Sequence, residues 1–116
     1  MITDYRFNED NELSVRHYAE TDCATYINMT NHAYFNLCGK GKKITEHRLH
    51  IPADRILDTT PAFIPTGKRM NVKNTPFDFT SLKPIGTDLY ADHEQLLWNK
   101  GYNHCYILKG KCLRRC

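Results

Sequence analysis

The sequence predicts an all-β protein whose antiparallel strands form a sandwich. Three observations support this class: short segments alternate polar and apolar residues, turn-forming residues separate them, and closely spaced prolines exclude long helices between residues 53 and 84. The 116 residues have the length of one domain, and no internal repeat or linker divides them. We therefore expect a single domain.

Residues 4–20 are expected to form a β-hairpin. Leu13, Val15 and His17 alternate with more polar neighbours, as in a half-buried strand. The turn falls at residues 8–11, where Asn and Asp side chains cap backbone groups and tolerate a left-handed conformation.

Residues 26–29 and 30–37 are two further strand candidates. In the second, "TNHAYFNL", a period of two separates a polar face from an apolar face: His32, Tyr34 and Asn36 against Ala33, Phe35 and Leu37. The apolar face is expected to pack in the core.

Residues 39–43 are rich in glycine and lysine and are expected to be a solvated hairpin tip. They lack the Gly-Lys-Ser/Thr ending of a phosphate-binding loop. Residues 47–51 alternate again and predict a strand that Pro52 closes, because proline cannot donate to a ladder.

The remaining chain is expected to contain loops, short strands and one short helix. Residues 53–84 contain closely spaced prolines, which exclude long helices, and large apolar residues, which predict an ordered region. Residues 88–98 could form a helical turn or two, with Leu89, Leu96 and Leu97 as its apolar side. Residues 102–108 alternate as a last strand.

Charge and hydropathy exclude some classes of partner. The formal charge of +3 comes largely from Lys109, Lys111, Arg114 and Arg115, which predicts a basic tail rather than a nucleic-acid-binding patch. No stretch approaches the roughly 20 apolar residues of a membrane span, and the N-terminus lacks the apolar core of a signal peptide. We expect a cytoplasmic protein with neither a nucleic-acid nor a membrane partner.

The cysteines do not predict a metal site. The five residues, Cys23, Cys38, Cys105, Cys112 and Cys116, fit neither paired zinc knuckles nor a redox CxxC pair. We expect reduced thiols and no bound metal.

The polar face of residues 30–37 is the first candidate for chemistry. It combines an imidazole, a phenol and an amide, which suit the hydroxyl-rich surface of a sugar, and histidine exchanges protons near neutrality. The alternative is that these side chains only face solvent. A second Asn-His pair, Asn103-His104, heads the last strand, and the two pairs could converge on one polar pocket. The other histidines, His17, His47, His50 and His93, are expected at the surface.

Five segments together resemble the aldose 1-epimerase, or galactose mutarotase, family: "TNHAYFNL", "HRLHIPADRILDTTPAFIPTG", "TPFDF", "IG" and "GYNHCYIL". The resemblance implies a β-supersandwich that binds a free aldohexose, such as galactose or glucose, and interconverts its α and β anomers without a cofactor or metal. The implied chemistry is acid–base. A carboxylate takes the proton of the anomeric hydroxyl, an imidazolium protonates the ring oxygen, and the ring opens and recloses.

The resemblance also assigns site residues. His32 matches the histidine that acts as the acid at the ring oxygen, and Tyr34 matches a neighbouring position in the binding cleft. Asn103 stands where the family has a sugar-binding aspartate. Because an amide makes weaker, neutral hydrogen bonds with hydroxyls, we expect reduced affinity or an altered epimer preference.

The resemblance covers the central portion of the family's domain. Residues 1–116 match neither the segment that supplies a substrate-binding arginine and a further histidine nor the one that supplies the catalytic glutamate. Asp54, Asp58 and Asp78 match no catalytic position, so the acid is expected here without its base. The alternative is a non-catalytic carbohydrate-binding or interaction fragment. Exposed strand edges would favour self-association.

Overall fold

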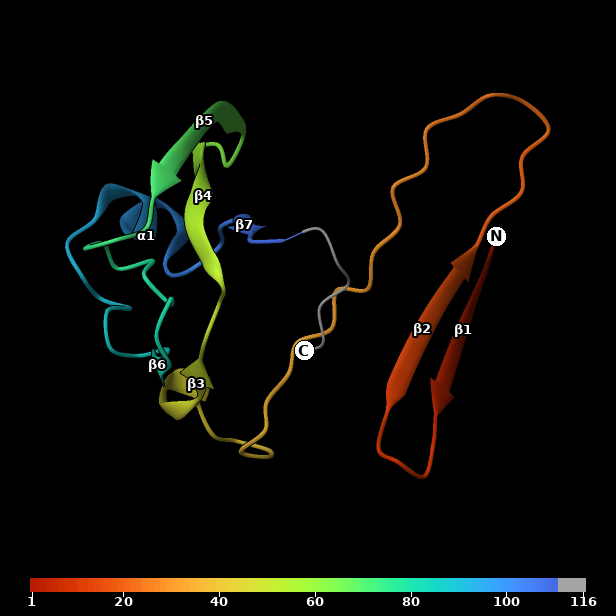
Figure 1. Ribbon diagram of the computed structural model, residues 1–116, viewed down its shortest axis with the longest axis horizontal. Coiled ribbons are helices and arrows are strands. Elements are labelled where there is room, and N and C mark those ends of the chain that lie inside the picture. Colours follow the sequence, from red (N-terminus) through yellow and green to blue (C-terminus); the bar gives the residue numbers. More distant parts are fainter. Residues whose placement is uncertain (111–116) are drawn as a thin grey trace. The chain divides into compact units, whose positions relative to one another are not determined.

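The computed structural model describes residues 1–110 (Figure 1). Two compact units follow each other along the chain, Met1–Phe35 and the residues from Asn36 onward. All paired strands are antiparallel, which confirms the predicted all-β class. The predictions of a basic tail and reduced thiols also involve Lys111, Arg114, Arg115, Cys112 and Cys116, which lie outside the described residues.

The first unit contains the predicted hairpin. Strand β1 (Ile2–Phe7) pairs with β2 (Leu13–Tyr18), so that Tyr5 lies opposite Val15. The turn uses an asparagine cap, as predicted: Asn8 Oδ1 accepts hydrogen bonds from the backbone N–H groups of Asp10 and Glu12 at 3.1 and 2.9 Å.

The strands expected at residues 26–29 and 30–37 are not formed, and that prediction was wrong. Among the described residues none pairs with this stretch. The side chains of Phe35 and Leu37 are 70% and 85% exposed, so the expected packing face is uncovered. Local hydrogen bonds take the place of a ladder, because Asn31 Oδ1 accepts from Ala33 N–H at 3.1 Å and Asn36 Oδ1 from Cys38 N–H at 3.0 Å.

The glycine-rich stretch is a turn, but not the tip of a hairpin. Gly39 and Gly41 have φ of 80° and 83°, a conformation that glycine adopts without strain. The turn leads into the 3₁₀ helix η1 (Ile44–Glu46) and then into strand β3 (Arg48–Leu49), which is shorter than expected and pairs with β6 (Lys83–Pro84).

Gly86, in the "IG" segment, brings two backbones of this unit together. Its N–H donates to the carbonyl of Thr45 at 2.8 Å. A Cβ at Gly86 would lie 2.9 Å from Thr45 Cβ, so only glycine fits this approach.

The proline-rich region holds longer strands than the sequence predicts. Strands β4 (Ala53–Thr59) and β5 (Pro65–Asn71) form a hairpin, and β4 also pairs with β7 (Tyr106–Leu108). The prolines are tolerated because Pro61 lies in the connecting turn and Pro65 is the first residue of its strand. Figure 1 shows β4 between its two partners.

The predicted helix of a turn or two is present near the end of residues 88–98 and runs one residue past that stretch. Helix α1 (Glu94–Asn99) begins after His93, whose Nδ1 accepts from Gln95 N–H at 3.3 Å, and ends at Lys100 with φ of 53°. Leu96 is 3% exposed and Leu97 63%, so the two do not share an apolar side, because successive helical residues lie about 100° apart.

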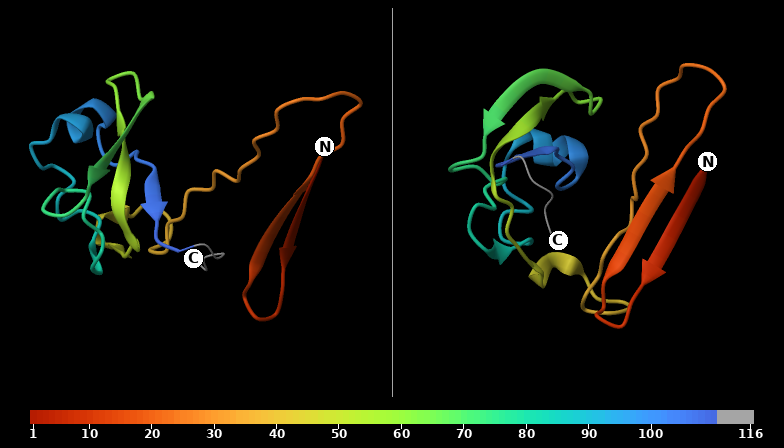
Figure 2. Two further views of the ribbon diagram at one scale, coloured as in Figure 1. Left: turned by 45° about the horizontal axis from the view of Figure 1, so that its top comes forward. Right: turned by 45° about the vertical axis from the view of Figure 1, so that its right-hand side comes forward.

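The core of the second unit lies between α1 and the β4–β5 hairpin, whose curved ribbon runs beside the helix (Figure 2). It is the cluster Ile56, Val72, Phe77 and Leu96. Strand β4, the segment that follows β5 and helix α1 contribute to it, and the "TPFDF" segment supplies Phe77 as a core residue. Within residues 1–110, no helix has the length and apolar character needed to cross a bilayer.

Candidate functional site

The predicted site residues fall in both units. His32 and Tyr34 belong to the first unit and Asn103 to the second. His32 and Tyr34 are exposed and lie together, with ring centroids 5.0 Å apart and planes inclined by 40°. The structure thus brings the imidazole and the phenol side by side, although on an irregular segment rather than on a strand.

Asn31 holds the backbone beside His32. Its amide donates to the hydroxyl of Tyr5 on β1 at 3.1 Å, while its carbonyl oxygen accepts from the N–H of Ala33. The position of His32 is therefore set by an asparagine that binds the hairpin through one end of its amide and the following backbone through the other.

Asn103 lies after helix α1 and has an exposed side chain. Its backbone N–H donates to Nδ1 of His104 at 3.2 Å. The neighbouring Tyr102 and His104 are half-buried, so Asn103 faces outward and His104 inward. The convergence of the two Asn-His pairs on one polar pocket stays a prediction.

His104 packs inside the second unit. Its ring centroid lies 4.2 Å from that of Phe77, and its Nε2 lies 3.0 Å from Oε1 of Gln95. Burial, together with the nearby His93, lowers the pKa of His104. Both effects favour the neutral form of the imidazole.

Gln95 is the polar centre of this unit, and no motif of the sequence predicts it. It is 1% exposed, and its Nε2 donates to Asp58 Oδ1 at 2.6 Å and to Met70 Sδ at 3.3 Å. Burial of an amide is tolerated when its hydrogen bonds are satisfied. The available signal was weak: Gln95 is the one glutamine of the sequence, beside Leu96.

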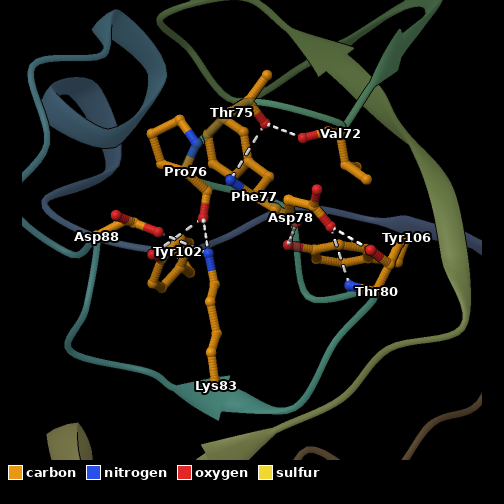
Figure 3. Close-up of polar contacts among 10 residues, drawn as sticks. All are labelled: Val72, Thr75, Pro76, Phe77, Asp78, Thr80, Lys83, Asp88, Tyr102 and Tyr106. Atoms are coloured by element: carbon orange, nitrogen blue, oxygen red, sulfur yellow. Dashed lines mark hydrogen bonds and ion pairs between the residues drawn. The ribbon is translucent and has the colours of Figure 1, made fainter.

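The "TPFDF" segment supports the residue before Asn103. The hydroxyl of Tyr102 and the ammonium of Lys83 both donate to the carbonyl of Pro76, at 3.2 and 3.4 Å (Figure 3). Lys83 also pairs with Asp88 at 2.6 Å. Burial, aided by the Asp88 charge, raises the pKa of Tyr102 to about 12, so this phenol acts as a structural donor.

The carboxylates of the loop region have structural partners. Asp58 accepts from the hydroxyl of Thr66 at 2.7 Å, Asp78 accepts from Thr80, and Asp54 lies 3.4 Å from Lys109. The Thr66 hydroxyl holds the pKa of Asp58 below its usual value, and Thr80 does the same for Asp78. None of these three resembles a free general base.

Histidines expected at the surface also have structural roles. His93 caps α1, His47 Nε2 accepts from Leu37 N–H at 2.8 Å, and His17 Nδ1 lies 3.0 Å from Thr3 Oγ1. All three are half-buried, whereas His50 is exposed. The prediction holds for His50 alone among these four.

The described metal-ligand side chains are dispersed, and the described cysteines are unpaired. Within residues 1–110, no three His, Cys, Asp or Glu side chains are grouped to hold a metal ion. Cys23, Cys38 and Cys105 are free thiols, as predicted.

The apolar cavity beside Tyr102 is a poor match for a sugar. It has a volume of about 360 Å³ and is lined mainly by aliphatic and aromatic side chains, among them Leu49, Phe79 and Ile85. His32, Tyr34 and Asn103 are not among its lining residues.

The chain is similar to aldose 1-epimerases and galactose mutarotases. The family model described as aldose 1-epimerase matches residues 2–115. The aldose 1-epimerase of Escherichia coli K12 is 39% identical over 107 residues, which cover 92% of this chain and 31% of that protein. The galactose mutarotase of Bos taurus is 36% identical over 105 residues, which cover 90% of this chain and 29% of that protein.

A solved structure is similar as well. The crystal structure of galactose 1-epimerase from Lactobacillus acidophilus superposes with a TM-score of 0.62 at 36% identity, and the match covers 70% of this chain and 24% of that one. The chain thus spans less than a third of the length of these relatives.

Proposed function

The chain belongs to the aldose 1-epimerase family, and from that premise we propose that it acts on free aldohexoses such as galactose and glucose and interconverts their α and β anomers. The observation that carries the proposal is the family match over residues 2–115. The exposed imidazole–phenol pair of His32 and Tyr34 supports it.

In the proposed reaction, His32 is the acid. Histidine changes charge near neutrality and can therefore deliver a proton to the ring oxygen and recover it on closure. A ligand can reach the exposed imidazole of His32, and Asn31 holds the adjoining backbone. Tyr34, whose ring centroid lies 5.0 Å from that of His32, is proposed to contact the sugar.

Asn103 is proposed to hydrogen-bond a sugar hydroxyl. Its exposure leaves both ends of the amide available. A carboxylate accepts charge-assisted hydrogen bonds about twice as strong as those of an amide. Asn103→Asp is therefore expected to tighten galactose binding about fivefold, or about 1 kcal/mol, in calorimetric titration.

We propose that none of Asp54, Asp58 and Asp78 is the base. Each is engaged by a hydroxyl, an amide or an ammonium group. The 116 residues alone would then accelerate mutarotation only weakly, because the proton transfer to a positioned base, typically worth about 10²–10⁴-fold, would be missing.

The same observation favours a second candidate, a carbohydrate-binding fragment that is not catalytic. Polarimetry on freshly dissolved α-galactose, beside calorimetry with galactose, separates the two. A rate above that of buffer supports the epimerase. Binding without a rate supports the fragment, and neither binding nor rate contradicts both.

Self-association is proposed through the unpaired edges of β5 and β7, each of which pairs only with β4 among the described strands. Sedimentation at increasing concentration tests this, and a constant monomer mass would refute it. The cytoplasmic location stays a prediction.

A further inference from the structure

A chain of hydrogen bonds joins three elements of the second unit to the backbone of Asn103. Thr66 donates to Asp58 at 2.7 Å, and Gln95 Nε2 donates to the same carboxylate at 2.6 Å. Gln95 Oε1 lies 3.0 Å from His104 Nε2, and Asn103 N–H donates to His104 Nδ1 at 3.2 Å. The chain starts on the β4–β5 hairpin, crosses α1 and ends at an exposed residue.

The ionised carboxylate of Asp58 decides which group donates and which accepts in every bond of the chain. An ionised carboxylate can only accept, so the NH₂ group of Gln95 must face Asp58 and its carbonyl must face His104. The imidazole must then carry its proton on Nε2, which leaves Nδ1 free to accept from Asn103. The contact of Gln95 Nε2 with Met70 Sδ fits the same amide orientation, because the thioether sulfur is a weak acceptor.

We propose that Asp58, Gln95 and His104 form a positioning relay that fixes the Nε2–H tautomer of His104 and thereby orients the peptide of Asn103 toward its ligand. The proposal rests on the proposed function, in which Asn103 binds the sugar. None of the three relay residues is assigned contact with the substrate. They act through Asn103.

The other tautomer of His104 would break the relay. A proton on Nδ1 would set it against Asn103 N–H, donor against donor, so the peptide would have to move. Around His104, the titratable groups are His93 at the start of α1 and, beyond Gln95, Asp58, while the ring of Phe77 packs against the imidazole at a tilt of 47°. The amide of Gln95 separates the imidazole from the one carboxylate among these groups.

The first test needs no variant. Nitrogen-15 NMR of the full 116-residue chain reports which ring nitrogen of His104 is protonated. The relay predicts a protonated Nε2 and an unprotonated Nδ1 at neutral pH. A protonated Nδ1 would overturn it.

The second test compares two substitutions on the same helix. Gln95→Met keeps the length of the side chain but removes its hydrogen bonds to Asp58 and His104, whereas Glu94→Met places the same side chain at an exposed neighbouring position. Gln95→Met is expected to mix the His104 tautomers, shift the Asn103 amide signal and weaken galactose binding about fivefold, equivalent to one lost hydrogen bond. Glu94→Met should change none of these.

The outcomes separate the relay from the function on which it rests. Unchanged ring-nitrogen and Asn103 signals in Gln95→Met would overturn the relay. If Gln95→Met does not fold, Asp58→Asn provides the comparison, because its amide can still accept from Gln95 and should preserve the tautomer. Loss of the tautomer there would also count against the relay. A wild-type chain that binds no galactose overturns the proposed function, while the ring-nitrogen signals still judge the hydrogen bonds.

Discussion

The hydroxyl of Tyr106 donates a hydrogen bond of 3.0 Å to the carbonyl of Phe77 and so joins strand β7 to the buried "TPFDF" segment. Phe77 is fully buried, with 0% exposure. Burial raises the pKa of Tyr106, which keeps the phenol protonated as a donor. The bond connects the strand after Asn103 to the core of the second unit.

Tyr106→Phe should lower the free energy of unfolding by about 1–3 kcal/mol, because a buried carbonyl loses its donor. Urea unfolding followed by circular dichroism measures the change. Tyr90→Phe, at a position 84% exposed, is the matched control and should have little effect. Equal midpoints for the two variants would show that the Tyr106 bond adds nothing.

Phe77→Ala should unfold the second unit. Truncation of a buried phenylalanine costs about 3–5 kcal/mol, a large part of the stability of a small domain. Phe63→Ala is the control, because Phe63 is 50% exposed and lies in the β4–β5 turn. Proton NMR should lose its dispersed core signals in the first variant only. A folded Phe77→Ala chain would contradict the assigned core.

Stability should fall as the pH drops below the ordinary histidine value of 6.5. The pKa of His104 is lower in the folded chain than in the unfolded chain, so the unfolded state binds the proton first and acid favours unfolding. The stability is complete above the unfolded value and is lost as the pH falls toward the folded one. Urea midpoints measured from neutral pH downward should show this loss in wild type and a smaller one in His104→Gln. Identical profiles would contradict it.

A second loss of stability is expected in stronger acid. Asp58 and Asp78 have pKa values below the ordinary 3.8 when folded, so their contribution is complete above that value and disappears as the pH falls through the folded values. Asp78→Asn should reduce this loss, whereas Asp54→Asn, at an exposed ion pair, should leave it nearly unchanged. Two identical acid profiles would argue against the Asp78–Thr80 bond as its source.

The sequence predicted those elements whose information is local. The hairpin of β1 and β2 carries its own alternation and an asparagine turn, and both appear in the structure. The β4–β5 hairpin was underestimated because Pro61 and Pro65 looked like breaks, although one occupies the turn and the other starts a strand. A proline's effect depends on which backbone N–H groups the ladder needs.

Only those residues of the candidate site that lie in family motifs could be predicted from the sequence. His32, Tyr34 and Asn103 came from the segments shared with the family, whereas Gln95 has no pattern that marks its burial. Its role depends on contacts to Asp58 and His104, 37 and 9 residues away, which periodicity does not report. The strand at residues 30–37 failed for a related reason, since a strand requires a partner as well as an alternating pattern.

Polarimetry of freshly dissolved α-galactose tests the proposal that His32 supplies the proton for mutarotation. Wild type, His32→Gln and the exposed control His50→Gln would be compared at equal concentration against buffer alone. If His32 is the acid, wild type and His50→Gln should exceed the buffer rate, and His32→Gln should fall to it. An undiminished rate in His32→Gln would contradict it.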